Sequence, residues 1–494
     1  MDSLKRCWTA AAASKERWCI LILSALAAVH VFVFSAAFPF FNVDEMYHFD
    51  LVVKYSRLDF PRKPEYVSEE SLRYLVVYST WEYTRTNDTL SAPPWKQPMS
   101  VMAPILISRE IRWRSLLNYE ATQPPLYYLF AGACWRLGEP LGFHDGFLLY
   151  LLHFLNMLVV GALVWAGWFA ARLVFPGNLF VRIALPALLA FLPNRIFYSV
   201  NNDLLSPLCF GLTFVGLVKF LRDDLPSKRL AAATGLALAA TFLSKSSNLP
   251  LLAVSAVVIA LKIWTLFKKE NVRASFTLLA LLFLCSALPM AAWIVWCKIN
   301  FGDFIGTSDI AHQLGWTVRP FSEWWHHPIF TPRGLWFFLS GNLQTLWQDE
   351  MLWYYQPLFL RPVNLFYSLA SIVFILSALF CHKKAGIFQR RAVLFAFALV
   401  VAGFAFYGYL SIIYDFHNCF YPSRESPYFV SGRLILGALV PFLLLFVIGL
   451  DGALNKLGNA GKFFVLAMLL LFMLGTEIAT DWPVFFSQYN WYDM

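Results

Sequence analysis

Charged residues are scarce in this chain: only 14% of its 494 residues are Asp, Glu, Lys or Arg. Soluble domains carry about 25% charged residues. The chain is instead 59% hydrophobic, with a mean hydropathy of +0.58. A soluble core of this size cannot hide so much apolar surface. We therefore expect an integral membrane protein.

Cysteine spacings typical of metal or disulfide frameworks are also lacking. The eight cysteines are scattered and form no CxxC pair. The net charge of +9 does not indicate nucleic acid either, because the basic residues sit in short loops between apolar runs. Such loops face an anionic lipid leaflet. Neither a cysteine-based metal site nor a nucleic-acid partner is predicted.

Long apolar runs are abundant. At about 1.5 Å rise per residue, a helix of roughly 20 residues crosses a hydrocarbon layer of about 30 Å. The sequence predicts an all-α polytopic membrane protein with about eleven transmembrane helices, in a single membrane domain over residues 1–494. The predicted helices cover residues 18–38, 146–171, 183–200, 204–221, 230–243, 249–267, 274–296, 363–381, 392–413, 434–450 and 463–479.

Basic residues cluster in alternate loops, as in Lys5 and Arg6 before the first run and Lys268 and Lys269 after the sixth. Cytoplasmic loops of membrane proteins are enriched in Lys and Arg. We therefore expect a cytoplasmic amino terminus and an exported carboxyl terminus. Three substantial segments are then exported, and function is expected there: a first loop with interfacial helices, residues 39–145, then residues 297–362 and 414–433.

The string NVDEMYHFD follows the first apolar run. On a helix, the spacing of Asp44, Glu45 and His48 brings both carboxylates to the imidazole. The alternative is that Asn42 or Asp44 only caps the next helix. Because ionisable clusters at the membrane edge are costly and tend to be functional, we favour a catalytic or ligand role.

Further polar residues are predicted at the same exported face. A second polar cluster closes the third run and comprises Arg195, Asn201, Asn202 and Asp203. The alternative is that the NND turn simply caps the helix that begins at residue 204. Lys245 lies in a helix break, LSKSSNLP, where it could hold an anionic head group or snorkel to the interface.

Arg433 precedes a late apolar run in SGRLILGALVP. It is either a phosphate-binding cation or a topological anchor. Arginine anchors are expected on the cytoplasmic side, so its exported position favours function.

In their order, these motifs resemble the GT-C superfamily of membrane glycosyltransferases. They comprise DE and a nearby His after the first helix, QPPLYY, NND, LSKSSNLP and SGRLILGALVP. The chain is most similar to a bacterial family of predicted membrane proteins, and more distantly to protein O-mannosyltransferases and lipid A aminoarabinose transferases. The resemblance covers most of the chain and implies the bacterial inner (plasma) membrane.

The resemblance implies a polyprenyl-phosphate-linked sugar donor, reaction on the exported face, and a first-loop carboxylate at the centre of catalysis, either Asp44 or Glu45. Lys245 and Arg433 are the phosphate candidates. Gln123 stands where His is common, and Asn202 stands where Pro is common. The substrate-binding residues predicted in this way are His48, Gln123, Asn202, Asp203, Lys245 and Arg433.

No cofactor is predicted, although Mg²⁺ or Mn²⁺ bridging Asp44 and Asp203 is an alternative. Lipid, glycan and protein acceptors stay open, and membrane lipids are expected partners. A transporter or lipid-linked sugar flippase is the rival function. It is disfavoured because no internal repeat is evident and the ionisable residues cluster on one face. A non-catalytic assembly partner is a third possibility.

Overall fold

Helices make up most of the computed structural model, which describes residues 2–37, 40, 44–79, 93–268, 272–353, 356–381, 386–417, 419 and 421–490. Every predicted apolar run contains a helix. These helices are α1 (Asp2–Ser35), α7 (Asp145–Val174), α8 (Leu179–Ala190), α9 (Leu205–Arg222), α10 (Lys228–Ser244), α11 (Leu249–Lys268), α12 (Val272–Asn300), α15 (Arg361–Cys381), α16 (Ile387–Ile413), α17 (Leu439–Ala453) and α18 (Asn459–Phe485).

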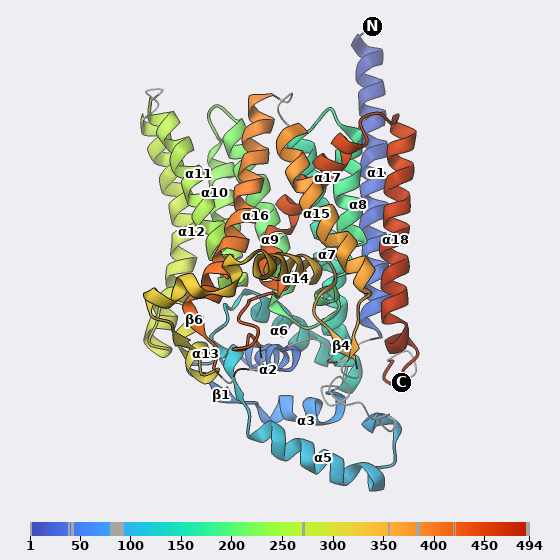
Figure 1. The fold of residues 1–494 in the computed structure, drawn as a ribbon, viewed down its shortest axis with the longest axis vertical. Coiled ribbons are helices and arrows are strands. Elements are labelled where there is room, and N and C mark those ends of the chain that lie inside the picture. Colours follow the sequence, from blue (N-terminus) through green and yellow to red (C-terminus); the bar gives the residue numbers. More distant parts are fainter. Residues whose placement is uncertain are drawn as a thin grey trace.

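Nine helices in the described residues are long and apolar enough to cross a membrane. The two remaining predicted helices are shorter, since α8 has 12 residues and α10 has 17. The helices run nearly parallel in one bundle (Figure 1). The prediction of an all-α polytopic membrane protein is confirmed, and about eleven helices roughly fits.

The predicted helix over 183–200 is wrong in its second half. Helix α8 ends at Ala190, and the chain then forms the short 3-10 helix η4 (Arg195–Tyr198). The side chain of Asn194 accepts from the backbone N–H of Ile196 at 3.0 Å. Local side-chain to backbone bonds of this kind compete with helix continuation. The apolar run therefore turns back before it can form one span.

Helix α17 lies at the core of the bundle, because 89% of its most apolar window is buried. The corresponding buried share is 22% for both α12 and α18. A helix that is apolar all round belongs in a protein interior or in lipid. In Figure 1, α12 and α18 stand at opposite edges of the bundle, where their exposed apolar side chains would face lipid.

The first long segment folds at one end of the bundle, below it in Figure 1. It contains α2 (Glu45–Ser56), α3 (Glu69–Tyr78), η1 (Pro94–Lys96), α5 (Met99–Arg114), η2 (Tyr119–Thr122), α6 (Leu126–Gly138) and η3 (Glu139–Leu141), and β1 (Glu65–Tyr66) pairs antiparallel with β2 (Leu117–Asn118). The predicted QPPLYY helix is α6, which begins directly after Pro125. A Cβ on Gly132 would lie 2.9 Å from the backbone nitrogen of Ser56, so glycine permits the close α2–α6 packing.

The other two long segments meet the first at the same end. The second contains α13 (Thr307–Gln313), β3 (Thr317–Val318), η7 (Phe321–His326), η8 (Pro328–Phe330), α14 (Pro332–Gln348) and the hairpin of β4 (Leu352–Trp353) with β5 (Gln356–Pro357). The third contains β6 (Tyr414–Asp415), which pairs antiparallel with β3, and leads into η10 (Gly432–Ala438). Two short helices complete the fold, η5 (Asn202–Leu204) and η6 (Ser246–Asn248).

Candidate functional site

The guanidinium of Arg433 contacts three carboxylates that are far apart in sequence. Its Nη2 lies 2.7 Å from Asp44 Oδ2, its Nε lies 3.3 Å from Glu350 Oε1, and its Nη1 lies 3.8 Å from Asp203 Oδ2. Lys245 Nζ donates to the other oxygen of Asp203. We call these five residues the Arg433 cluster. It lies where the three long segments meet the bundle.

Asp44 precedes α2 in a left-handed conformation, with φ 64° and ψ 0°. Non-glycine residues adopt this conformation at an energetic cost and often at functional sites. The side chain makes no capping hydrogen bond. Its Oδ1 accepts from the Tyr119 hydroxyl, and its Oδ2 accepts from Arg433. Capping by the Asp44 side chain is therefore not found, and the other proposed cap, Asn42, lies outside the described residues.

The pKa of Asp44 reflects these contacts. Burial acts to raise it, but the charge of Arg433 and the hydrogen bonds from Arg433 and Tyr119 outweigh burial and hold the pKa below its usual value of 3.8. Asp44 is thus ionised at neutral pH. A carboxylate whose two oxygens are both engaged is a counter-ion for Arg433 first, and a weak proton acceptor.

Asp203 and Lys245 form a second buried pair. Asp203 lies in η5, where the Asn201 side chain accepts from the Asp203 backbone N–H at 2.9 Å. Asn201 therefore caps this turn with its side chain, and the Asp203 carboxylate pairs with Lys245 instead. The Lys245 side chain is 7% exposed. It therefore reaches into the cluster and does not snorkel.

Gln123 and Asn202 contact each other, because Asn202 Nδ2 donates to Gln123 Oε1 at 3.0 Å. This bond joins the start of α6 to the turn that precedes α9. Both residues are substrate-binding predictions from the sequence. The structure places them directly beside residues of the Arg433 cluster.

Glu45 and His48 take different partners from those that helical spacing indicated. Glu45 is fully buried; its Oε1 accepts from the backbone N–H of Val200 at 2.7 Å and lies 3.2 Å from His153 Nε2. His48 Nδ1 lies 2.7 Å from the Tyr128 hydroxyl. Asp44 lies outside the helix in a left-handed conformation, and its side chain pairs with Arg433 and Tyr119 and not with His48.

The His48 imidazole is neutral. Burial and the positive charges of Lys245 and Arg433 lower its pKa to about 3, although Asp44 acts in the opposite direction. A neutral imidazole cannot supply positive charge to a phosphate. Its position suggests hydrogen bonding within the site.

Two acidic residues at the site, Glu350 and Glu120, are not among the residues predicted from the sequence. Glu350 follows α14, and its Oε1 accepts from the Ser431 hydroxyl at 2.5 Å. Burial, helped by the nearby negative charges of Asp349 and Asp44, raises the pKa of Glu350 to about 7 against the effect of Arg433. Glu120 lies in η2 and is 8% exposed. Asp349 and Glu350 form an acidic pair directly after α14, as Asp44 and Glu45 form one after the first apolar run, and this likeness was the signal in the sequence for Glu350.

The carboxylates do not form a metal site as arranged. Among the described residues, no group of three or more His, Cys, Asp and Glu side chains could hold a metal ion. The guanidinium of Arg433 lies between Asp44, Asp203 and Glu350, so these carboxylates serve as its counter-ions. The arrangement does not fit the Mg²⁺ or Mn²⁺ alternative.

Arg195 belongs to a different cluster from Asn202 and Asp203, and grouping them was wrong. Its Nη2 lies 2.5 Å from Asp481 Oδ1 on α18, and its Nη1 donates to the Gln348 carbonyl at 2.7 Å. The physical reason is the turn at η4, which points Arg195 towards α18. Arg195 thereby ties α18 to the end of α14, two residues before Glu350.

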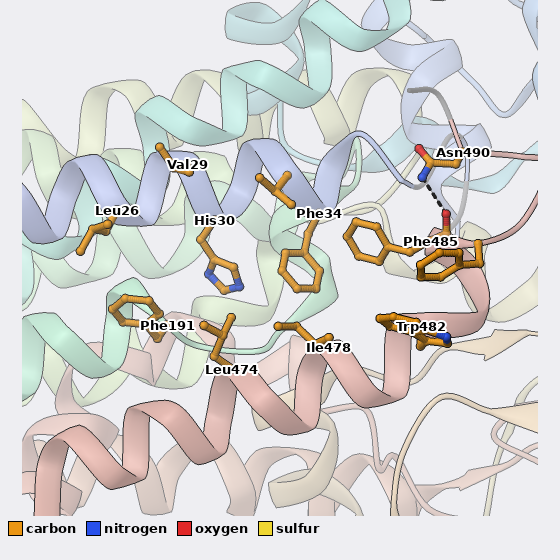
Figure 2. A pocket seen from close by; sticks show the side chains of 12 residues that line it. Leu26, Val29, His30, Phe34, Phe191, Leu474, Ile478, Trp482, Phe485 and Asn490 are labelled. Atoms are coloured by element: carbon orange, nitrogen blue, oxygen red, sulfur yellow. Dashed lines mark hydrogen bonds between the residues drawn. The ribbon is translucent and has the colours of Figure 1, made fainter. Parts of the chain in front are cut away.

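A pocket of about 610 Å³ lies between α1 and α18. Figure 2 shows apolar and aromatic side chains around it, with the His30 imidazole on its wall. His30 Nε2 lies 2.8 Å from Glu477 Oε2. The pocket lining includes none of the Arg433 cluster; the residues that line it are Leu26, Val29, His30, Val33, Phe34, Phe191, Leu474, Ile478, Trp482, Phe485, Phe486 and Asn490.

Comparisons with known proteins find only distant structural similarity. No family model matches the chain, and no curated protein matches it significantly. The crystal structure of the Archaeoglobus fulgidus oligosaccharyltransferase in complex with Zn and sulfate is 12% identical, with a TM-score of 0.46, over 96% of this chain and 53% of that one. The archaeal oligosaccharyltransferase AglB from Archaeoglobus fulgidus, in complex with an inhibitory peptide and a dolichol-phosphate, is 12% identical, with a TM-score of 0.44, over 96% and 56%. This chain spans about half the length of each.

Proposed function

We propose that this membrane protein is a glycosyltransferase of the GT-C type. It would move a sugar from a polyprenyl-phosphate-linked donor to an acceptor hydroxyl on the exported face. The observation that carries the proposal is the Arg433 cluster, in which two buried cations and three carboxylates meet at one end of a membrane bundle. Four of its five residues are the ones that the motif resemblance indicates.

Arg433 and Lys245 suit the donor phosphate. Arginine offers a planar fork of donors that matches phosphate oxygens, and lysine adds a compact charge. Both cations are paired with carboxylates in this structure. A bound donor phosphate would compete with Asp44 and Asp203 for them. In a site shielded from water, such fixed charges stabilise the negative charge that develops on a departing phosphate.

The transfer itself is a single displacement. The acceptor oxygen bonds to the anomeric carbon while the bond from that carbon to the donor phosphate oxygen breaks, and a carboxylate of the first long segment takes the acceptor proton. One displacement inverts the anomeric centre. A product that retains the donor configuration would contradict this mechanism.

The setting also fits a donor held in lipid. Asp203 and Arg433 lie in short helices that form the first turns of the candidate spans 202–222 and 432–453. The cluster is therefore at the edge of the predicted hydrocarbon layer, where a polyprenyl-phosphate head group would lie. We propose a cytoplasmic amino terminus and a bacterial inner membrane location. The sugar and the lipid, glycan or protein acceptor stay open.

The test is transfer by the purified protein in lipid, from a panel of radiolabelled polyprenyl-phosphate sugars to cell-envelope extract. We expect transfer by the wild type and a loss of about 10²-fold or more in Asp44→Asn, as for removal of a charged group that acts in the transition state. Asp59→Asn changes an exposed aspartate of the same segment, and is the matched control that should keep activity.

Absence of turnover with every donor, in protein shown to be folded, would contradict the proposal. The rival transporter or flippase then predicts that a lipid-linked sugar crosses a vesicle membrane without cleavage of its phosphate–sugar bond. That assay would use the same reconstituted protein.

A further inference from the structure

The carboxylates of the Arg433 cluster are already engaged by other groups. Both oxygens of Asp44 accept hydrogen bonds, from Tyr119 and from Arg433. Asp203 accepts a hydrogen bond from Lys245, and Glu350 accepts one from the Ser431 hydroxyl. Each of these carboxylates therefore has a partner that must leave, or that weakens its basicity, before it can take a proton from a substrate.

Glu120 differs from them because it makes no ion pair with a cation among the described residues. Its Oε2 atom is buried and has no hydrogen-bond partner there; Asp203 Oδ2 also lacks a hydrogen bond, but it lies 3.8 Å from Arg433 Nη1. A buried polar atom without a partner costs free energy, and such atoms in a folded protein call for an explanation. The residue lies between Tyr119, which bonds to Asp44, and Gln123, which bonds to Asn202. Glu120 thus sits within the wall of the site.

The backbone at Glu120 is held firmly. Asn118 Oδ1 accepts from the Glu120 backbone N–H at 3.0 Å, while Asn118 Nδ2 donates to the Tyr47 carbonyl and to Asp50 Oδ2, both at 2.9 Å. Asn118 also belongs to the β1–β2 ladder. A functional side chain needs this kind of support to hold a productive geometry.

The charges around Glu120 belong to the same site. Burial and the negative charge of Asp44 raise its pKa to about 7, while Lys245, Arg433 and a hydrogen bond with Gln123 act to lower it. An effective general base has a pKa near the working pH. Asp44, with its lowered pKa, is less suited to that task.

We propose that Glu120 is the general base of the transfer, an inference that rests on the glycosyltransferase function proposed above. Glu120 Oε2 takes the proton of the acceptor hydroxyl as the acceptor oxygen bonds to the anomeric carbon. The bond from that carbon to the donor phosphate breaks, and its electron pair stays on the phosphate oxygen. Asp44 then acts as the residue that positions Arg433.

The test compares two acceptors in Glu120→Gln. With a hydroxyl acceptor, we expect the rate to fall by about 10²–10⁴-fold, which is the usual contribution of a general base. Azide attacks without losing a proton, so transfer to azide should stay close to the wild-type rate. Glutamine has nearly the same shape as the protonated carboxyl, so the variant is expected to fold. Glu110→Gln, on the exposed surface of α5, is the matched control.

A pH profile gives the second readout. The kcat/KM of the wild type should rise with pH through about 7, where Glu120 loses its proton. Glu120→Asp should keep a basic limb but lose about tenfold or more in rate, because the shorter side chain misplaces the oxygen.

Three outcomes would overturn the assignment: an unchanged rate in Glu120→Gln, equal losses with hydroxyl and azide acceptors, or a wild-type rate and profile in Glu120→Asp. Failure of the wild type to transfer to either acceptor would instead contradict the glycosyltransferase function itself.

Discussion

Arg433 donates to Asp44 across 389 positions of sequence, with Nη2 and Oδ2 2.7 Å apart. The two side chains are only 12% and 16% exposed. This contact joins the left-handed turn before α2 to the short helix before α17. It therefore links the first long segment to the core helix of the bundle.

Breaking this pair from either side should destabilise the protein. Arg433→Gln leaves the mostly buried Asp44 without its cation, at a cost of about 3–5 kcal/mol. Asp44→Asn should cost less, because Arg433 keeps its contacts with Glu350 and Asp203. The double variant removes both charges and should cost less than the sum by about 0.5–3 kcal/mol. Thermal unfolding of the four proteins in detergent measures this coupling. Strictly additive effects would show that the contact does not contribute.

Glu45→Gln should show whether Glu45 stabilises the fold or takes part in the reaction. Its carboxylate holds the Val200 backbone N–H and lies beside His153, so the variant should lose stability by about 1–3 kcal/mol. The loss of transfer per folded molecule should be at least tenfold smaller than the loss in Asp44→Asn, because Glu45 acts only through the turn at 200–203. A loss of kcat equal to that of Asp44→Asn at full stability would place Glu45 among the reacting groups.

The raised pKa of Glu350 predicts that the free energy of unfolding depends on pH. Its pKa is raised from 4.5 to about 7 in the folded protein. An acid whose pKa is higher in the folded than in the unfolded protein destabilises the fold once it ionises. This destabilisation is absent at a pH below the pKa of the unfolded state and complete at a pH above the pKa of the folded state. Glu350→Gln should therefore gain stability over the wild type between pH 5 and pH 8, by about 1–3 kcal/mol.

The matched control for this variant is Glu323→Gln, which changes an exposed glutamate of the same segment. Its melting temperature should follow the wild type at every pH. A constant difference between wild type and Glu350→Gln across the pH range would contradict the raised pKa.

Asp481→Asn tests the tie between α18 and the site. It leaves Arg195 buried without its carboxylate, so we expect a loss of about 3–5 kcal/mol. Because Arg195 also holds the Gln348 carbonyl, transfer should weaken as well. Glu69→Gln breaks an exposed pair with Arg114, in which the two side chains are 70% and 47% exposed, and should cost about 1 kcal/mol or less. Equal effects of the two substitutions on the melting temperature would refute this role.

Chelators should not abolish transfer. Arg433 lies between the carboxylates that could otherwise bind a divalent ion, so the cations of the protein itself are expected to stabilise the phosphate. The measurement is transfer in EDTA before and after addition of Mg²⁺ or Mn²⁺. Loss of activity that either ion restores would show that these carboxylates rearrange to bind metal.

Hydropathy was sufficient to predict the helices. Each of the eleven apolar runs contains a helix, because lipid leaves a polar backbone few other ways to satisfy its hydrogen bonds. The length of α8 was not predictable in this way. Asn194 and the following turn end the run by local hydrogen bonds that an average over an apolar window does not register.

The sequence by itself determined the membrane class, the positions of the helices and the polar residues that apolar segments cannot tolerate without a purpose, such as Lys245 and Arg433. Only the tertiary structure decided the partners. In the folded protein, Glu45 contacts Val200, Arg195 contacts Asp481, and Glu350 contacts Arg433. Charge pairing acts over a few ångströms in space, and residues hundreds of positions apart reach that range only when the helices pack.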